Sequence, residues 1–336
     1  MNIYRVAGAE LLKFLSQLPL AAKENENKNY LKLIKKVVGY NQGKIADYSF
    51  LANESHKQLR KCYQNVIDKR NAAKEGDYKA LLKAYQNVSV GLIRQFKGHA
   101  AENFQFMEEY CLSKDFNQKK ARFCIKSAIL KQEAFEILPI AGSVPLRNNT
   151  AYQASESTSF SYVIRTGKYY LCNNIPEQVK RRKYKNSRIE EEHVFDFYKL
   201  PKRLDNLRFR FTDKKDTSWI RCWNNGNLSQ QTGEPSSYYK STLVVPLSFL
   251  ARAGDLSDAF IENFQVREDK IILGFLCLDH ENINFFNENS DVDFASVIAD
   301  LLSLYWVHYS ICTNQSSIFQ RSYDLLKSHR SFSTSV

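Results

Sequence analysis

The pattern of apolar positions along the chain changes near residue 120. Before that point, apolar side chains recur every three or four residues, which is typical of amphipathic helices. The runs at 9–22, 29–38 and 55–75 predict short helices separated by polar stretches. A longer helix is predicted to begin at residue 78 and to end at Gly98. Its apolar face consists of Tyr78, Leu81, Leu82, Tyr85, Val88, Leu92 and Phe96.

After residue 120, apolar and polar residues alternate, which is typical of β-strands. The runs 121–130 and 133–141 are separated by two residues and predict a hairpin, and residues 142–160 are predicted to form a loop. A last helix is predicted from about Asp293, with a frayed tail at the end of the chain. Further strands are predicted at 169–174, 193–200, 207–213, 241–250 and 270–279.

The order of these elements indicates the fold class. Helices come first, sequential strands follow, and one helix closes the chain. This order is typical of an α+β protein built around an antiparallel sheet, rather than of an alternating βαβ fold. A hydrophobic content of 43% and a charged content of 25% agree with a globular chain.

The sequence favours a cytoplasmic location. Its longest apolar run has eight residues and ends before Asp279, whereas a helix that spans a bilayer needs about 20. The first 15 residues lack the apolar segment of a signal peptide. We therefore expect no membrane partner.

The cysteines and histidines predict neither a metal site nor an active site. Seven cysteines are present and none forms a CxxC pair, so we expect each to be a small buried hydrophobe in a reducing compartment. The six histidines are scattered, and no P-loop, GxGxxG, HExxH or GxSxG motif occurs. We therefore expect a non-enzymatic protein without a cofactor.

Charge is distributed unevenly along the chain, whose net charge is +12. Residues 1–100 contain 18 Lys and Arg against 8 Asp and Glu, whereas residues 251–300 contain 3 against 11. The basic N-terminal part indicates an anionic partner or a surface that docks on the acidic part. Charge alone leaves both interpretations open.

Three segments of the second part resemble the landmarks of GAF domains, in their usual order. The first is Thr166-Gly167-Lys168, and the second is Lys240-Ser241 followed by Val245-Pro246-Leu247. The third is Gly274-Phe275-Leu276, followed by a helix from Phe286 to Val307. The resemblance covers about residues 78–312.

This resemblance implies a GAF-like twisted antiparallel sheet with helices on one face and a small-molecule pocket on the other. It also implies three parts: a basic α-helical region at 1–77, a GAF-like domain at 78–312, and a short helix with a flexible tail at 313–336. Cyclic-nucleotide-binding relatives carry an Asn-Lys pair where this chain has Asp279-His280. A bridge between His280 and Asp291 is the one replacement the sequence offers for their Lys–Asp bridge.

Candidate ligand-binding residues follow from strand alternation and from the segment that would cover the pocket. On strand 121–130, Phe123, Ile125 and Ile129 share one face, and Lys126 lies on the other with Arg122 and Cys124. A lysine there needs either an anionic partner or a route to water for its ammonium. The predicted ligand-binding residues are Lys126, Arg208, Arg210, Trp219, Arg221, Asp279 and His280.

These observations lead to one leading hypothesis and two alternatives. The leading hypothesis is a sensor in which the GAF-like domain binds a small anionic, nucleotide-like ligand and signals through the N-terminal helices, as a homodimer. The first alternative is a nucleic-acid-binding protein that uses its basic helices and keeps the GAF-like domain as a scaffold. The second is a scaffold for a protein partner.

Overall fold

The structure is a computed structural model. The described residues are 24–69, 75–114, 121–131, 134–143, 151–186, 239–250, 265–267 and 270–333. The helix predicted at 9–22 lies outside them, and so do the strands predicted at 193–200 and 207–213.

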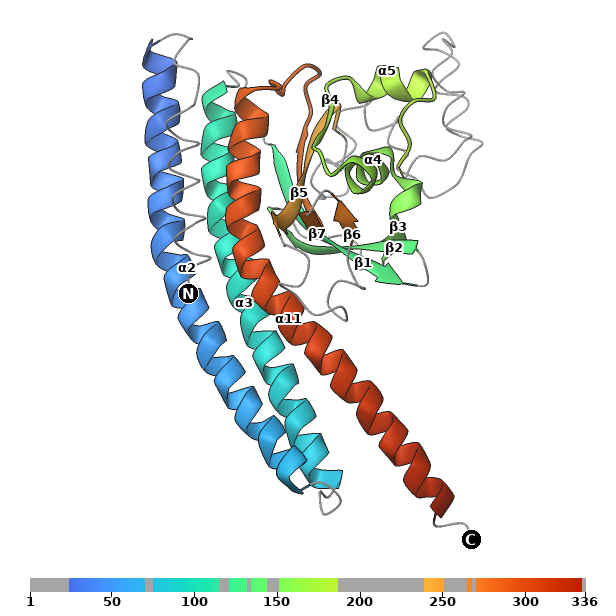
Figure 1. Cartoon of the computed structure of the whole chain (residues 1–336). Coiled ribbons are helices and arrows are strands. Elements are labelled where there is room, and N and C mark those ends of the chain that lie inside the picture. The colour runs from blue at the N-terminus through green and yellow to red at the C-terminus, as the bar shows by residue number, and fades with distance from the viewer. Residues whose placement is uncertain are drawn as a thin grey trace, which may run out of the picture.

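Three long helices lie side by side along one side of the molecule (Figure 1). They are α2 (Glu24–Lys69), α3 (Glu75–Lys114) and α11 (Ser290–Ser333). All are longer than the apolar pattern predicts: α2 joins two predicted helices into one, and α11 continues well beyond residue 312. The sequence predicted a separate short helix and a flexible tail after residue 312, whereas α11 is continuous as far as Ser333.

The predicted end of the long helix at Gly98 is also wrong, because α3 continues for 16 residues beyond it. Glycine in a helix interior costs only about 1 kcal/mol relative to alanine. The next turns carry Ala100, Phe104 and Met107, which are buried in the core. Burial of these side chains outweighs the weak local preference of a single glycine.

The sheet is antiparallel, which confirms the predicted α+β class. Its strand order is β3-β2-β1-β7-β5-β4, and β6 pairs with one end of β7. The predicted hairpin is confirmed, because β1 pairs with β2 from Lys131 and Ala134 onward. The strands are β1 (Arg122–Lys131), β2 (Ala134–Gly142), β3 (Tyr152–Gln153), β4 (Tyr170–Cys172), β5 (Ser241–Leu250), β6 (Gln265–Arg267) and β7 (Lys270–His280).

Helices α3 and α11 cover one face of the sheet, and α2 packs on their outer side (Figure 1). As predicted, Phe123 and Ile125 of β1 are buried on this face, with exposed fractions of 1% and 0%. Ile129 is instead exposed, because β1 pairs with β7 only as far as Ser127 and its end lies beyond the covered part of the sheet.

The other face of the sheet is covered by the short helix α4 (Thr158–Thr166), with Phe160 and Val163 buried against β5 and β7. A 3-10 turn (Ala154–Glu156) precedes α4, and a further short helix, α5 (Ile175–Lys180), follows β4. The sequence predicted a loop at 142–160 and helices on one face only. In both respects the structure differs from the prediction.

One hydrophobic core joins α2 to the rest of the molecule. Buried residues of α2, such as Val37, Tyr48 and Ala52, belong to the same cluster as residues of α3, α11 and the sheet. The apolar faces of α3 and α11 are covered within the chain, since Leu81, Phe96, Ile298 and Leu302 are in this core. The homodimer and the boundary at residue 77 stay predictions.

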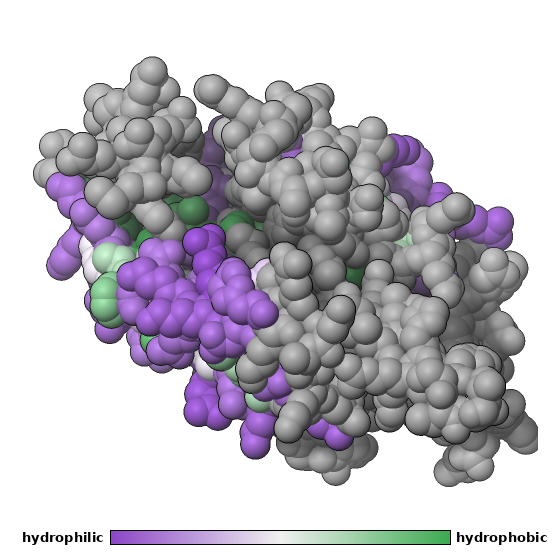
Figure 2. Space-filling model, turned by 60° about the horizontal axis from the view of Figure 1, so that its bottom comes forward, coloured by the Kyte–Doolittle hydropathy of each residue, from purple (hydrophilic) through white to green (hydrophobic). Residues whose placement is uncertain are grey.

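The surface of the described residues is mainly hydrophilic when the molecule is seen from below, with apolar side chains in smaller areas (Figure 2). Within the described ranges, no helix is long and apolar enough to cross a membrane.

Candidate functional site

The face of β1, β7 and β5 beneath α4 carries three rows of side chains across the sheet. The strand register places residues of the three strands directly opposite one another, and side chains at such positions are neighbours. From one end to the other, the rows are Arg122–Asp279–Thr242, Cys124–Cys277–Val244 and Lys126–Phe275–Pro246.

Lys126 lies in the row nearest β3 and α4. Its Nζ donates a hydrogen bond to Tyr152 Oη at 2.9 Å, and it lies 4.7 Å from the centre of the Phe160 ring. Among the described residues, Lys126 forms no ion pair with a carboxylate. Burial lowers the pKa of Lys126, but attraction to the Cys124 thiolate and the hydrogen bond to Tyr152 raise it by more, so the net direction is upward and the ammonium stays charged.

Gly274 allows β1 and β7 to approach closely beside Lys126. A Cβ atom at Gly274 would lie 2.2 Å from the backbone oxygen of Lys126. Glycine in a strand often marks such a close approach of two backbones. A β-bulge at the neighbouring Leu273 changes the alternation of β7, so that Phe275 faces α4 although Leu273 faces the long helices.

Cys124 and Cys277 form a pair in the middle row. They are directly opposite on β1 and β7, and Cys277 forms a hydrogen bond with Cys124. This hydrogen bond and the charge of Lys126 lower the pKa of Cys124 to about 7, against the effect of burial. Burial raises the pKa of Cys277.

Asp279 lies in the third row, where it is held by protein groups. Arg122 Nη2 is 3.3 Å from Asp279 Oδ2, and the Thr242 hydroxyl donates to Asp279 Oδ1 at 2.8 Å. The Arg122 guanidinium also lies 5.0 Å from the centre of the Tyr239 ring. Asp279 therefore shares the face of Lys126, as an anion that orients Arg122.

His280 is separated from Lys126 by the sheet. It is the next residue of β7 after Asp279 and is buried against the Phe285 ring, with 3.5 Å between the ring centres. Its Nδ1 accepts a hydrogen bond from the backbone N–H of Asn282 at 3.1 Å. The structure therefore does not bring His280 together with Lys126. The predicted Arg208, Arg210, Trp219 and Arg221 lie outside the described residues.

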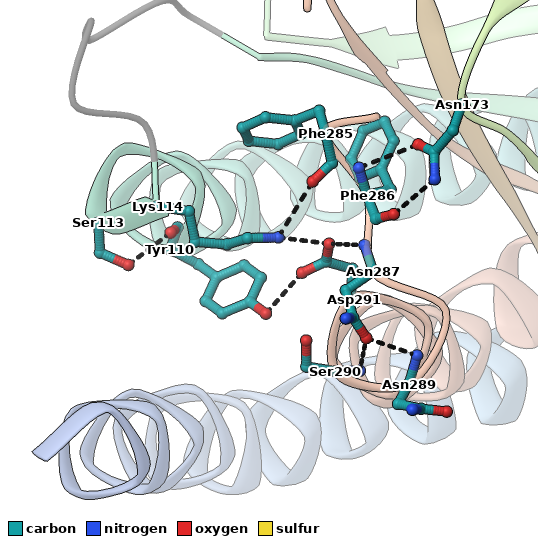
Figure 3. Close-up of polar contacts among 10 residues, drawn as sticks. All are labelled: Tyr110, Ser113, Lys114, Asn173, Phe285, Phe286, Asn287, Asn289, Ser290 and Asp291. Carbon is teal, nitrogen blue, oxygen red and sulfur yellow. Dashed lines mark hydrogen bonds and ion pairs between the residues drawn. The ribbon is translucent and has the colours of Figure 1, made fainter. Parts of the chain in front are cut away.

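Asp291 at the start of α11 is paired with α3 (Figure 3). Its carboxylate forms an ion pair with Lys114 and accepts hydrogen bonds from the Tyr110 hydroxyl and the Asn287 backbone N–H, each at 2.6 Å. The partner of Asp291 is therefore Lys114, and not His280 as the sequence suggested.

Asn173 ties β4 to the same turn. Its side chain accepts from the Phe286 backbone N–H at 3.0 Å and donates to the Phe286 carbonyl at 2.6 Å (Figure 3). The backbone N–H of Asn284 donates to the Asn173 carbonyl at 2.7 Å. The segment between β7 and α11 is thus fastened to a strand on one side and to α3 on the other.

Sequence reasoning missed three parts of this site. Tyr152 and Phe160 lie in the stretch that was predicted as a loop, although Phe160, Val163 and the left-handed Gly167 cap are a weak signal for a short helix. The third part is the cysteine pair, which depends on the register of β1 against β7.

Comparison with protein-family models gives no match for this chain, and comparison with curated proteins gives none either. In the part of the chain that the structure describes, no three His, Cys, Asp or Glu residues come together in a group that could hold a metal ion.

Proposed function

We propose that the protein is a sensor, with a GAF-like domain that binds a small anionic ligand on the α4 side of its sheet. The observation that carries this proposal is the position of Lys126. Its ammonium is held between a phenol and an aromatic ring, and no described carboxylate neutralises it.

The energetics of a partly buried charge support an anionic ligand. A charged group withdrawn from water is unfavourable unless it is paired. The phenol of Tyr152 supplies a hydrogen-bond acceptor but no full negative charge at neutral pH, because burial raises its pKa. A phosphate or carboxylate of a ligand would supply both.

The surroundings of Lys126 favour a ligand that also has a flat apolar part. Phe160 and Tyr152 present aromatic rings beside the ammonium. Aromatic rings stack on nucleobases, and cations beside them hold phosphate. A nucleotide-like molecule combines these two properties.

A physical route leads from this face to the long helices. Alternate residues of β5 and β7 face α4 and the helices: Val244 and Cys277 lie on the ligand side, and Leu243 and Leu278 lie in the helical core. A ligand that displaces β7 would therefore also change the packing of α3 and α11, because packed interfaces shift between discrete arrangements rather than deform smoothly. The Asp291–Lys114 pair fastens the start of α11 to α3 and would transmit such a shift.

The test is native mass spectrometry of the freshly purified full chain. We expect a fraction of the protein to carry a small anionic molecule that is released on unfolding. A Lys126→Met variant prepared in the same way should carry less of it. Co-purified nucleic acid that is lost steeply between about 50 and 200 mM salt, and equally in both proteins, would favour the nucleic-acid-binding alternative and contradict this proposal.

A further inference from the structure

The cysteine pair beneath α4 has a geometry that its role as a buried hydrophobe does not require. Cys124 and Cys277 are directly opposite on neighbouring antiparallel strands. Opposite residues in such a pair have Cα atoms about 4.5 or 5.5 Å apart, and a disulfide bridges Cα separations of about 4.4–6.8 Å. The two sulfurs can therefore join without a change in strand register.

The two cysteines differ in the exposure of the residue as a whole and in the electrostatic surroundings of the thiol. Cys124 is partly exposed, whereas only 4% of Cys277 is exposed. The residue opposite Cys124 on β2 is Gly142, which has no side chain to cover the thiol. Lys126 lies two residues along the same face of β1, so its positive charge is close to Cys124. Nearby cations favour the thiolate, which is the nucleophilic form of cysteine.

We propose that Cys124 and Cys277 form a reactive dithiol that reduces a hydroperoxide and closes to a disulfide between β1 and β7. This inference does not require an anionic ligand, because the thiolate of Cys124 would itself place a negative charge beside Lys126.

The reaction balances with a hydroperoxide as the two-electron oxidant. The Cys124 thiolate attacks one oxygen of the peroxide, the O–O bond breaks, and the leaving oxygen takes a proton and departs as an alcohol or as water. Cys124 is then a sulfenic acid. The Cys277 sulfur attacks it, the S–O bond breaks, water leaves with the thiol proton, and the disulfide forms. Two thiols are oxidised and one peroxide is reduced.

Lys126 acts here as a positioning residue for the thiolate. The hydrogen bond with Cys277 and the charge of Lys126 both lower the pKa of Cys124, so more of this thiol is ionised at neutral pH than of an ordinary cysteine. An ordinary cysteine with a pKa of about 8.5 is only a few per cent ionised. Removal of the lysine should therefore slow the reaction at pH 7, because it removes one of the two groups that favour the thiolate, while the hydrogen bond with Cys277 remains.

The test uses the reduced full chain and hydrogen peroxide, followed by alkylation of the remaining thiols and peptide mapping without reductant. The expected product links the peptide with Cys124 to the peptide with Cys277. Cys111 is the internal control. Burial raises its pKa to about 12, so it should escape oxidation and be recovered in the alkylated form. If peroxide treatment of the folded protein leaves both Cys124 and Cys277 free to be alkylated, the inference is wrong.

Two variants sharpen the test. In Cys277→Ser, oxidation should stop at a sulfenic acid on Cys124, which a dimedone probe would trap. In Lys126→Met, the rate should fall several-fold at pH 7 and approach the wild-type rate at high pH, where Cys124 is ionised in both proteins. A rate that does not depend on Lys126 at pH 7 would contradict the proposed role of the lysine.

Discussion

Lys126 donates a hydrogen bond of 2.9 Å to the hydroxyl of Tyr152, which joins β1 to the short strand β3 beneath α4. The acceptor is neutral, while the donor is charged. The pair therefore satisfies the hydrogen-bonding requirement of the ammonium without cancelling its charge. On the helical side of the sheet, by contrast, the buried Asp291 forms an ion pair with a charged lysine, Lys114.

Replacement of Tyr152 by phenylalanine should destabilise the protein by about 1–3 kcal/mol, because the ammonium of Lys126 loses its acceptor. Chemical denaturation of the two proteins measures this difference. In the background of Lys126→Met, the same change should have a much smaller effect, since there is no donor left. Equal effects in both backgrounds would mean that the hydrogen bond contributes nothing.

Gly274→Ala should destabilise the protein by at least 1–3 kcal/mol, since the new methyl group meets the backbone oxygen of Lys126. Gly98→Ala is the matched control: apart from the adjoining backbone of its own helix, no atom of the described residues lies within 4 Å of its added Cβ, and a helical glycine replaced by alanine gains about 0.5–1 kcal/mol. Thermal unfolding should shift in opposite directions for the two variants. A shift in the same direction would contradict the close approach of β1 and β7.

The Asp291–Lys114 ion pair should show strong coupling. Asp291→Asn should cost about 1.5–3 kcal/mol, the range for a hydrogen bond to a charged group. The double variant with Lys114→Met should cost less than the sum of the two single changes, because each single change leaves the other residue unpaired. Urea denaturation of the four proteins completes the cycle, and strict additivity would rule out the interaction.

Acidification should destabilise the helical core. Burial, aided by the charge of His56, lowers the pKa of His308 to about 4, whereas an unfolded histidine has a pKa of about 6.5. Between these values the unfolded chain binds more protons, so stability falls as the pH falls through this window. The contribution of His308 should lower the free energy of unfolding by about 2 kcal/mol between pH 7 and pH 5.

Urea denaturation at several pH values between 7 and 5 measures this effect. His308→Phe keeps an aromatic ring beside Tyr48 but cannot be protonated, so its stability should depend less on pH. The histidines His56 and His99 also have lowered pKa values because of burial, and they should retain part of the slope. An unchanged slope in His308→Phe would show that His308 is not responsible.

Much of the fold could be predicted because long elements repeat their apolar positions many times. The strands β5 and β7, the hairpin of β1 and β2, and the inward faces of Phe123 and Ile125 all follow from local alternation. The true helix lengths could not be predicted, since Gly98 is a weak helix-breaker whose effect tertiary packing overrides.

The site was harder to predict, because its residues meet through strand pairing. Lys126 could be assigned to the α4 side of the sheet by counting along one strand. The meeting of Cys124 with Cys277 depends instead on the register of two strands about 150 residues apart in sequence. His280 was misplaced because alternation puts it on the face opposite to Asp279, toward Phe285.

The central claim is that Lys126 binds an anionic ligand, and titration calorimetry with a panel of nucleotides and inorganic phosphate tests it most directly. The matched control is Lys57→Met, which removes the same charge from an exposed lysine on α2 that pairs with Glu54. Wild type and Lys57→Met should bind a member of the panel with equal affinity. Lys126→Met should bind it about ten- to a hundredfold more weakly, at an unchanged or higher melting temperature. Equal affinity in all three proteins, or binding by none of them, would contradict the claim.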